Sequence, residues 1–262
     1  MNTDLIELNK KRARHTRILR GLELSEQASV EELTAEFGLS EATIRRDLEE
    51  IEQSGRIIRV RGGARILSGL PGIIRKFGER SKISLAEKNA IVAEAEKHIP
   101  DGGVVILDNG TTSWLLAKRL KQKKNLTVIT NSLPIVEELG GCGDMKVLLS
   151  GGVFRQRNLD FIGADAAAFF REISADIAVM TCDSVKPALG IYKQSEESAD
   201  IARAMTGAAE KVFVIADHSK IGAAGMYRCL KPEDVDVFFI DASAPEKTRA
   251  ALQEVFLKVV YC

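Results

Sequence analysis

The 262-residue sequence lacks the marks of several common protein classes. Its cysteines are few and scattered, without the paired spacing of a metal site or of a small disulfide-stapled scaffold, and they are Cys142, Cys182, Cys229 and Cys262. We expect reduced thiols in a cytoplasmic protein. The three histidines are equally dispersed, so no metal site is predicted.

The sequence also has no long apolar run and no net charge. No run reaches the roughly 20 residues that span a bilayer, and the N-terminus has no secretory apolar core, so no membrane partner is expected. The formal net charge is zero, which argues against nonspecific polyanion binding by the whole molecule. No G-x-G-x-x-G follows a strand and no P-loop is present, so a nucleotide sensor is poorly supported.

What the sequence does contain is an uneven distribution of charge. Basic residues crowd the stretch from Lys10 to Arg20 and recur from Arg45 to Arg65, and the acids of this region lie mostly between them. Two basic stretches around an acidic one suit a protein that grips phosphates at defined points. Arg14 is predicted to touch a DNA backbone phosphate.

Residues 29–53 predict two short helices joined by a tight turn. Ser29 and Glu32 have the spacing of a capping box, and Gly38 can end the first helix in the left-handed conformation. Ser40 is a second cap. A preceding helix, from about residue 5 to 24, is expected to pack beneath, and the buried stripe of the second short helix is Ile44, Leu48 and Ile51.

The outward face of that second helix is small and basic at its start. At 100° per residue, Thr43 and Arg46 lie opposite the apolar stripe and Arg45 lies on its flank. Arg46 can offer a bidentate fork to a guanine edge, and Thr43 can meet a thymine methyl group. This first turn, which begins at Ser40 and Glu41, is therefore the predicted major-groove contact of a helix-turn-helix.

A basic strand follows. From Ile58 the sequence alternates apolar residues with arginine, so Arg59 and Arg61 are predicted to project from one face as a wing on the phosphate backbone. Residues 1–66 are thus predicted to form a winged helix-turn-helix. The alternative is a small helical hairpin whose arginines pair with Glu49 and Glu50.

The remaining chain predicts a second domain. Residues 67–82, centred on the turn-forming segment 68–72, are interpreted as a linker. From 83 to 262, six apolar runs alternate with helical stretches, at 104–107, 126–130, 147–149, 177–180, 212–216 and 235–240. Such runs suit strands buried on both faces, so we predict a doubly covered, mainly parallel α/β domain with its ligand site beyond the carboxyl ends of the strands.

Small hydroxyl, amide and glycine residues follow five of these strands. Gly110, Thr111 and Thr112 offer approachable backbone N–H groups, hydroxyl donors and a helix N-terminus to a phosphate, and Lys220 adds a charge. Asp108 and Asp183 would suit sugar hydroxyls. The other predicted contacts are Asn131, Ser132, Gly151 and Gly152. Ordinary strand-to-helix turns remain the alternative explanation.

Two sets of residues carry a family resemblance. One set resembles the DNA-binding signature of the deoxyribose-operon-repressor (DeoR) family of bacterial transcription regulators. It is the pattern Leu33-x3-Phe37-Gly38-Leu39-Ser40-Glu41-x-Thr43-Ile44-Arg45-Arg46-Asp47-Leu48. The other set resembles the sensor domain of the same family, a domain that is similar to sugar-phosphate isomerases. It consists of Phe77-x2-Arg80, Glu87-Lys88, Leu107-Asp108-x-Gly110-Thr111-Thr112 and Asp217-x-Ser219-Lys220-x-Gly222.

The resemblance implies a repressor of a carbohydrate-utilisation operon that binds double-stranded DNA and is released by a phosphorylated sugar, without a cofactor. One head reads few base pairs, so at least a homodimer is expected. The chain departs from the family around Asp183, where the usual glycines are absent, and at Ser198 and Ala202, where a Glu and a Lys are common. An isomerase-like enzyme with a DNA-binding head is the alternative, although the expected catalytic lysine and glutamate have no clear counterpart near Ala202.

Overall fold

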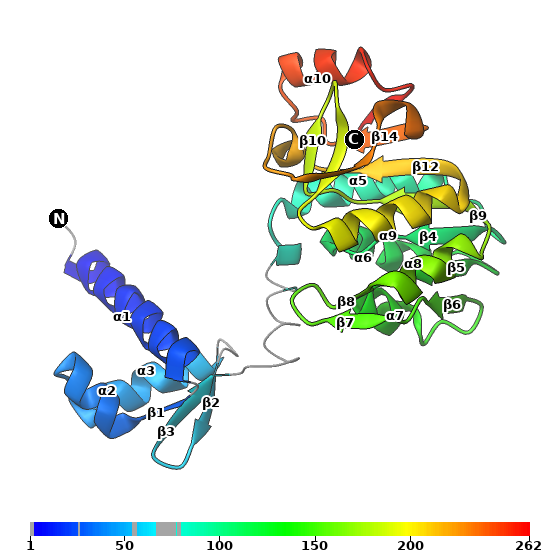
Figure 1. Ribbon diagram of the computed structural model, residues 1–262. Coiled ribbons are helices and arrows are strands. Elements are labelled where there is room, and N and C mark those ends of the chain that lie inside the picture. The colour runs from blue at the N-terminus through cyan, green and yellow to red at the C-terminus, as the bar shows by residue number, and fades with distance from the viewer. Residues whose placement is uncertain (1–2, 26, 54–56, 67–76, 78–79) are drawn as a thin grey trace. The chain divides into compact units, whose positions relative to one another are not determined.

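A computed structural model describes residues 3–25, 27–53, 57–66, 77 and 80–262 (Figure 1). The chain divides into two compact units, Met1–Lys76 and Phe77–Cys262. This division falls inside the predicted linker, because Phe77 and residues 80–82 belong to the second unit, whereas the centre of the linker at 68–72 lies outside the described residues. None of the described helices combines the length and the apolar character that crossing a membrane requires.

The helices of the first unit form as their capping signals predict. They are α1 (Thr3–Ser25), α2 (Val30–Phe37) and α3 (Glu41–Gln53). Ser29 and Glu32 make the capping box, and Gly38 is left-handed with a φ of 64°. The Ser40 hydroxyl accepts from the Thr43 N–H at 3.3 Å. Their apolar faces enclose one small core, which includes Ile18, Leu19, Leu22, Val30, Leu33, Ile44, Leu48 and Ile51.

A three-stranded antiparallel sheet completes this unit, in the order β1 (Gln27–Ser29), β3 (Gly63–Ile66), β2 (Ile57–Val60). Gly62 closes the β2–β3 hairpin with a φ of 85°. The predicted alternation was wrong in one respect. Ile57 is the buried residue of β2, whereas Val60 is 44% exposed because it pairs with Gly63 at the hairpin tip, where it has little to pack against.

The second unit is built on a seven-stranded sheet in the order β15-β14-β12-β9-β4-β5-β6, in which every pairing is parallel. Six strands match the predicted apolar runs: β4 (Val104–Leu107), β5 (Thr127–Thr130), β6 (Lys146–Leu149), β9 (Ala175–Met180), β12 (Ala209–Ile215) and β14 (Val237–Ile240). The edge strand β15 (Val259–Tyr261) was not predicted.

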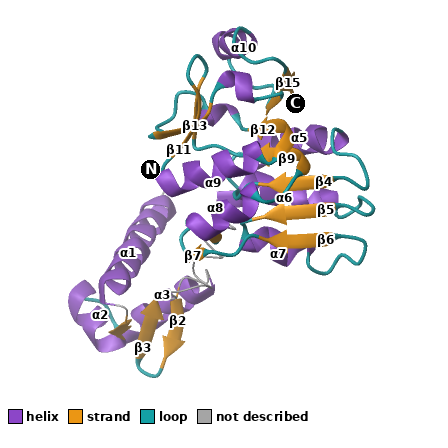
Figure 2. Ribbon diagram, turned by 45° about the vertical axis from the view of Figure 1, so that its right-hand side comes forward, coloured by secondary structure: helices purple, strands orange, loops and turns teal. Residues whose placement is uncertain are grey.

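Helices cover both faces of this sheet, as predicted (Figure 2). One set of alternate strand residues, which includes Leu107, Val128 and Val179, packs with α5 (Leu85–Lys97), α6 (Thr111–Leu120) and α7 (Leu133–Leu139). The other set, which includes Ile106, Ile129 and Met180, packs with α8 (Ala164–Arg171), α9 (Glu196–Gly207) and α10 (Glu246–Gln253). Because alternate side chains of a strand point to opposite faces of the sheet, each strand contributes to two separate cores.

The strand order reverses between β4 and β9. From β4 the chain builds outward through β5 and β6, then returns to β9 and builds the other way through β12, β14 and β15. Open α/β sheets bind ligands in the crevice at such a switch point, outside the carboxyl ends of the strands.

Smaller elements lie outside the seven-stranded sheet. They are the antiparallel ribbon of β7 (Val153–Arg155) and β8 (Asp160–Ile162), the short sheet of β10 (Ser184–Lys186), β11 (Gly190–Lys193) and β13 (Tyr227–Leu230), and the 3-10 turns η1 (His218–Lys220) and η2 (Pro232–Asp234).

Candidate functional site

The exposed face of α3 presents the predicted basic residues. Arg45 and Arg46 are exposed and Thr43 is half-buried, while Ile44 is fully buried behind them. Arg45 pairs with Glu41 at 3.1 Å. Arg46 has no ion-pair partner among the described residues, so its guanidinium is available to a base edge.

Arg14 is engaged elsewhere, and its predicted phosphate contact is corrected. Its Nε and Nη2 donate to the Asp47 carboxylate at 2.6 and 2.9 Å, and His15 Nε2 lies 3.0 Å from the same carboxylate. Asp47 is only 2% exposed. Burial acts to raise the pKa of Asp47, but the hydrogen bonds from Arg14 and His15 outweigh it and hold that pKa below its usual value. Arg14 therefore clamps α1 onto α3, because a buried carboxylate needs a partner.

The wing arginines lie as predicted, on the surface. Arg59 and Arg61 are exposed, and Arg61 sits at the hairpin tip. The Arg59 backbone N–H donates to Glu52 Oε1 at 2.7 Å, and its guanidinium lies 3.8 Å from Glu49 Oε1. These contacts place β2 beside α3. The weak pairing with Glu49 leaves Arg59 able to turn to a phosphate.

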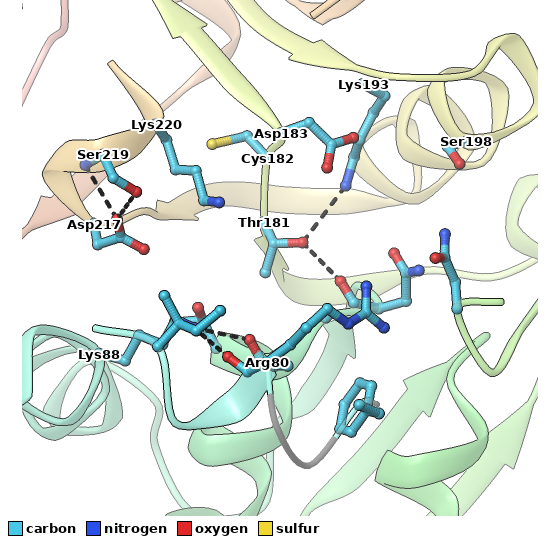
Figure 3. A pocket seen from close by; sticks show the side chains of 17 residues that line it. Arg80, Lys88, Thr181, Cys182, Asp183, Lys193, Ser198, Asp217, Ser219 and Lys220 are labelled. Carbon is cyan, nitrogen blue, oxygen red and sulfur yellow. Dashed lines mark hydrogen bonds between the residues drawn. The ribbon is translucent and has the colours of Figure 1, made fainter. Parts of the chain in front are cut away.

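A cavity of about 230 Å³ lies at the switch point of the second unit (Figure 3). Residues following three strands line it: 109–112 after β4, 181–183 after β9, and Asp217, Ser219 and Lys220 after β12. The remaining lining residues are Phe77, Arg80, Ile83, Lys88, Asn158, Lys193 and Ser198.

The turn into α6 can receive an anion. Gly110 has a φ of 134°, and a Cβ atom there would lie 3.1 Å from Thr181 Oγ1, so the position favours glycine. The first N–H groups of α6, starting at Thr111, have no acceptor within the helix. No side chain caps this N-terminus. The turn thus offers free donors with the positive end of a helix dipole behind them.

Lys88 lies against this turn without an ion pair to any described carboxylate, although the charge of Asp217 in the same pocket acts on it from further away. It is 6% exposed, and its Nζ donates to Thr111 Oγ1 at 3.1 Å and to the Arg80 carbonyl at 3.2 Å. Both acceptors are neutral, and burial lowers the pKa of Lys88. Neither Lys220 nor Arg80 has an ion-pair partner within the described residues. Of the two lining carboxylates, Asp217 accepts from the Ser219 N–H and hydroxyl, and Asp183 accepts from the Gln194 N–H at 2.9 Å. The pocket therefore carries spare positive charge.

Asp108 does not line this pocket, and its predicted contact with sugar hydroxyls is corrected. Its carboxylate accepts four hydrogen bonds, from Asn109 N at 2.8 Å, from Thr181 N and Oγ1 at 3.0 and 2.8 Å, and from Lys193 Nζ at 2.6 Å. A carboxylate has about four acceptor positions. Three of these donors meet Oδ2 and one meets Oδ1, and the residue is only 2% exposed, so Asp108 holds the wall of the pocket together.

Four other predicted contacts also lie away from the pocket. The Asn131 side chain donates to the Phe161 carbonyl at 2.9 Å, so the β7–β8 ribbon covers it and its neighbour Ser132. Gly151 and Gly152 follow β6, two strands from β4, and a Cβ atom on Gly152 would lie 2.7 Å from the Ile162 carbonyl oxygen. The structure thus brings together Gly110, Thr111, Thr112, Asp183 and Lys220.

Several lining residues were not singled out as ligand contacts. Arg80, Lys88 and Ser219 belong to the patterns that carry the family resemblance, which was the available signal. Arg80 lies 5.7 Å over the Phe77 ring, which in turn meets Trp114 edge-on. Lys193 had no such signal, because β11 is short and its place at the pocket depends on the tertiary fold. Among the described residues no group of three or more His, Cys, Asp or Glu side chains could hold a metal ion.

A winged helix-turn-helix followed by an α/β unit with a cationic cavity defines a transcriptional regulator with a sensor domain. The chain belongs to the DeoR family, since residues 14–69 match the DeoR-like helix-turn-helix domain and residues 83–242 match the DeoR C terminal sensor domain.

Curated relatives extend over nearly the whole chain. The transcriptional repressor AccR of Agrobacterium fabrum is 33% identical over 92% of this chain and 96% of its own. The HTH-type transcriptional regulator GlpR of Haloferax volcanii is 30% identical over 94% and 96%. The glycerol-3-phosphate regulon repressor of Escherichia coli is 27% identical over 97% and 100%. The relatives named as repressors make this chain a DNA-binding regulator of transcription rather than an enzyme.

Among solved structures, ribose 5-phosphate isomerase A of Methanocaldococcus jannaschii is 18% identical over 51% of this chain and 53% of its own, with a TM-score of 0.38. This likeness is too weak to bear on function.

Proposed function

We propose that this protein represses a carbohydrate-utilisation operon and is released from its operator when a phosphorylated sugar occupies the cavity at the switch point. The observation that carries the proposal is Lys88, a buried ammonium whose acceptors are two neutral oxygens beside an uncapped helix N-terminus.

The physical argument concerns the cost of that buried charge. An ammonium removed from water is unfavourable unless it is paired, and the lowered pKa of Lys88 expresses this cost. A phosphate seated between Lys88, Lys220 and the Thr111 turn would supply the missing negative charge. It would also accept charge-assisted hydrogen bonds from the free N–H groups of α6.

The opposite side of the cavity suits the sugar. Asn109, Asn158, Asp183 and Ser198 line it with amide, carboxylate and hydroxyl groups that can exchange hydrogen bonds with sugar hydroxyls. One of the relatives is itself named for the glycerol 3-phosphate regulon, which supports a phosphorylated polyol or sugar as the class of effector.

A route from effector to DNA starts at Arg80. Arg80 lies three residues after Phe77, where the sensor unit begins, and its carbonyl accepts from Lys88. An anion that draws Lys88 toward itself competes with this bond and would shift the segment through which the linker enters the sensor unit. We infer that the protein acts as at least a homodimer, because two heads set the spacing of two half-sites and a shift at each linker changes that spacing.

The test is Lys88→Met, which keeps the length of the side chain and removes its charge. We expect operator binding to remain while inducing sugar phosphates no longer release the DNA and inorganic phosphate no longer raises the melting temperature. Lys97→Met is the matched control, since Lys97 is exposed and pairs with Glu94 on the same helix. A Lys88→Met protein that still responds to inducer would refute the proposal.

A further inference from the structure

Lys193 is a second buried ammonium in the cavity, and it differs from Lys88 in being held by a carboxylate. Its side chain is 5% exposed and its Nζ lies 2.6 Å from Asp108 Oδ2, an atom of a side chain that is itself 3% exposed. Burial acts to lower the pKa of Lys193, but the charge of Asp108 outweighs it and raises that pKa. The ammonium therefore stays charged, and the pair is neutral as a whole.

The hydrogen-bond count of Lys193 leaves a donor facing the cavity. An ammonium has three N–H groups. One is given to Asp108, and one points weakly to Thr181 Oγ1 at 3.5 Å. Within the described part of the chain no acceptor meets the third, and Lys193 lines the cavity. Figure 3 shows its ammonium entering from a different side than Lys88.

Its neighbours fix what this donor can meet. The Thr181 hydroxyl carries one proton and already lies 2.8 Å from Asp108 Oδ2 and 2.7 Å from the Asn109 carbonyl. Burial raises the pKa of the Cys182 thiol to about 12, so it is neutral. Asp183 Oδ2 accepts from Gln194 N, and no donor among the described residues meets the other carboxylate oxygen beside the cavity. The third N–H group of Lys193 is thus a fixed donor, and the second carboxylate oxygen of Asp183 is an acceptor near it.

Resting on the function proposed above, we propose that Lys193 determines effector specificity by donating to a neutral carbonyl oxygen on the effector, while Asp183 accepts from an adjacent hydroxyl. The class of effector is then an open-chain hydroxycarbonyl phosphate, a ketose or aldose phosphate in its acyclic form. A second anionic group at this end is disfavoured, because Asp183 would repel it while Asp108 already neutralises Lys193.

The experiment compares three oxidation states on one carbon chain by thermal shift of the full-length protein. The three-carbon set is dihydroxyacetone phosphate, glycerol 3-phosphate and 3-phosphoglycerate, and the five-carbon set is ribulose 5-phosphate, ribitol 5-phosphate and 5-phosphoribonate. Inorganic phosphate is the reference probe. For at least one chain length we expect the ketose phosphate to bind about tenfold tighter than its alditol and its acid, as befits a hydrogen bond to a charged group.

Lys193→Met should remove this preference while inorganic phosphate still stabilises the protein. Because the single change leaves Asp108 buried without its counter-charge, Lys193→Met combined with Asp108→Asn serves as the second variant. If inorganic phosphate stabilises the wild-type protein but no ketose phosphate binds better than its alditol, the role of Lys193 is refuted. A preference that survives in either variant refutes it as well. A wild-type protein that ignores phosphate altogether rejects the phosphate site itself, and with it this assignment.

Discussion

The charged residues of this protein differ chiefly in whether they have an ion-pair partner. Arg14 and Lys193 are each paired with a buried carboxylate, while Arg46 on the surface and Lys88 in the interior have no ion-pair partner among the described residues. The sequence gives the residue types but not these pairings. An arginine on a basic helix looks the same whether it meets a phosphate or, like Arg14, a carboxylate brought to it by another helix.

His218 offers a test by pH. Its Nδ1 lies 2.8 Å from Asp241 Oδ1 and its backbone N–H donates to Asp241 Oδ2 at 2.7 Å, which fixes the turn η1 that carries Lys220 into the cavity. The hydrogen bond to Asp241 raises the pKa of His218. Because the folded-state pKa is raised, the stabilisation is complete below about pH 6.5 and is lost as the pH rises through the higher value.

We therefore expect the melting temperature of the wild-type protein to fall between pH 6 and pH 9 relative to that of His218→Gln, which does not titrate. The relative fall should be small, about 2 °C, because the His218 side chain is 36% exposed. Parallel curves for the two proteins would show that this pair adds nothing to stability.

At the scale of elements, the helix α3 joins two tasks on adjacent residues. Arg46 points outward, and Asp47 points inward to Arg14 and His15. The clamp on Asp47 therefore sets the orientation in which Arg46 is presented. The two arginines near the start of α3 precede acidic Glu49 and Glu50, so phosphate repulsion restricts DNA contact to the first half of the helix.

Arg46→Ala should weaken binding to the operator by about 1–3 kcal/mol and binding to random DNA only slightly, because a base-reading arginine contributes to specificity. Arg59→Ala is the comparison, since a phosphate contact loses affinity evenly on both DNAs. Titration of labelled duplexes at fixed salt measures both. Equal losses for Arg46→Ala on the two DNAs would make it a phosphate contact instead.

Most elements could be predicted from local signals. Capping residues and apolar spacing located α2 and α3, and continuous apolar runs located six strands of the sheet. The short strands β7, β8, β10, β11 and β13 carry no such run, so they were missed, and the three-residue run of β15 was missed as well. For the same reason Asn131 and Ser132 were expected at the pocket, although the β7–β8 ribbon covers them. Which strand ends meet at the pocket depends on the strand order, and residues alone do not supply that order.

At the scale of the whole molecule, the chain separates DNA recognition from ligand recognition into two units with separate cores. The division lies just before Phe77, and the first residues of the sensor unit help to build the cavity. The ligand site and the point where the linker enters are thus the same piece of structure.

If two heads act together, a duplex with two half-sites should bind the full-length protein at least tenfold more tightly than a duplex with one, because the second contact becomes intramolecular. Varying the separation by half a helical turn should abolish the gain. Light scattering on the free protein gives the number of chains. A single chain in solution and equal affinity for both duplexes would leave each head acting alone.

The buried ammonium of Lys88, which has no ion pair among the described residues, also bears on how long a molecule survives. Whatever neutralises it makes the folded chain harder to open, and quality-control proteases act on chains that have opened. A cell that exhausts the metabolite would then restore repression with molecules that are degraded sooner. The supply of the nutrient would therefore govern the abundance of the regulator as well as the affinity of the regulator for DNA.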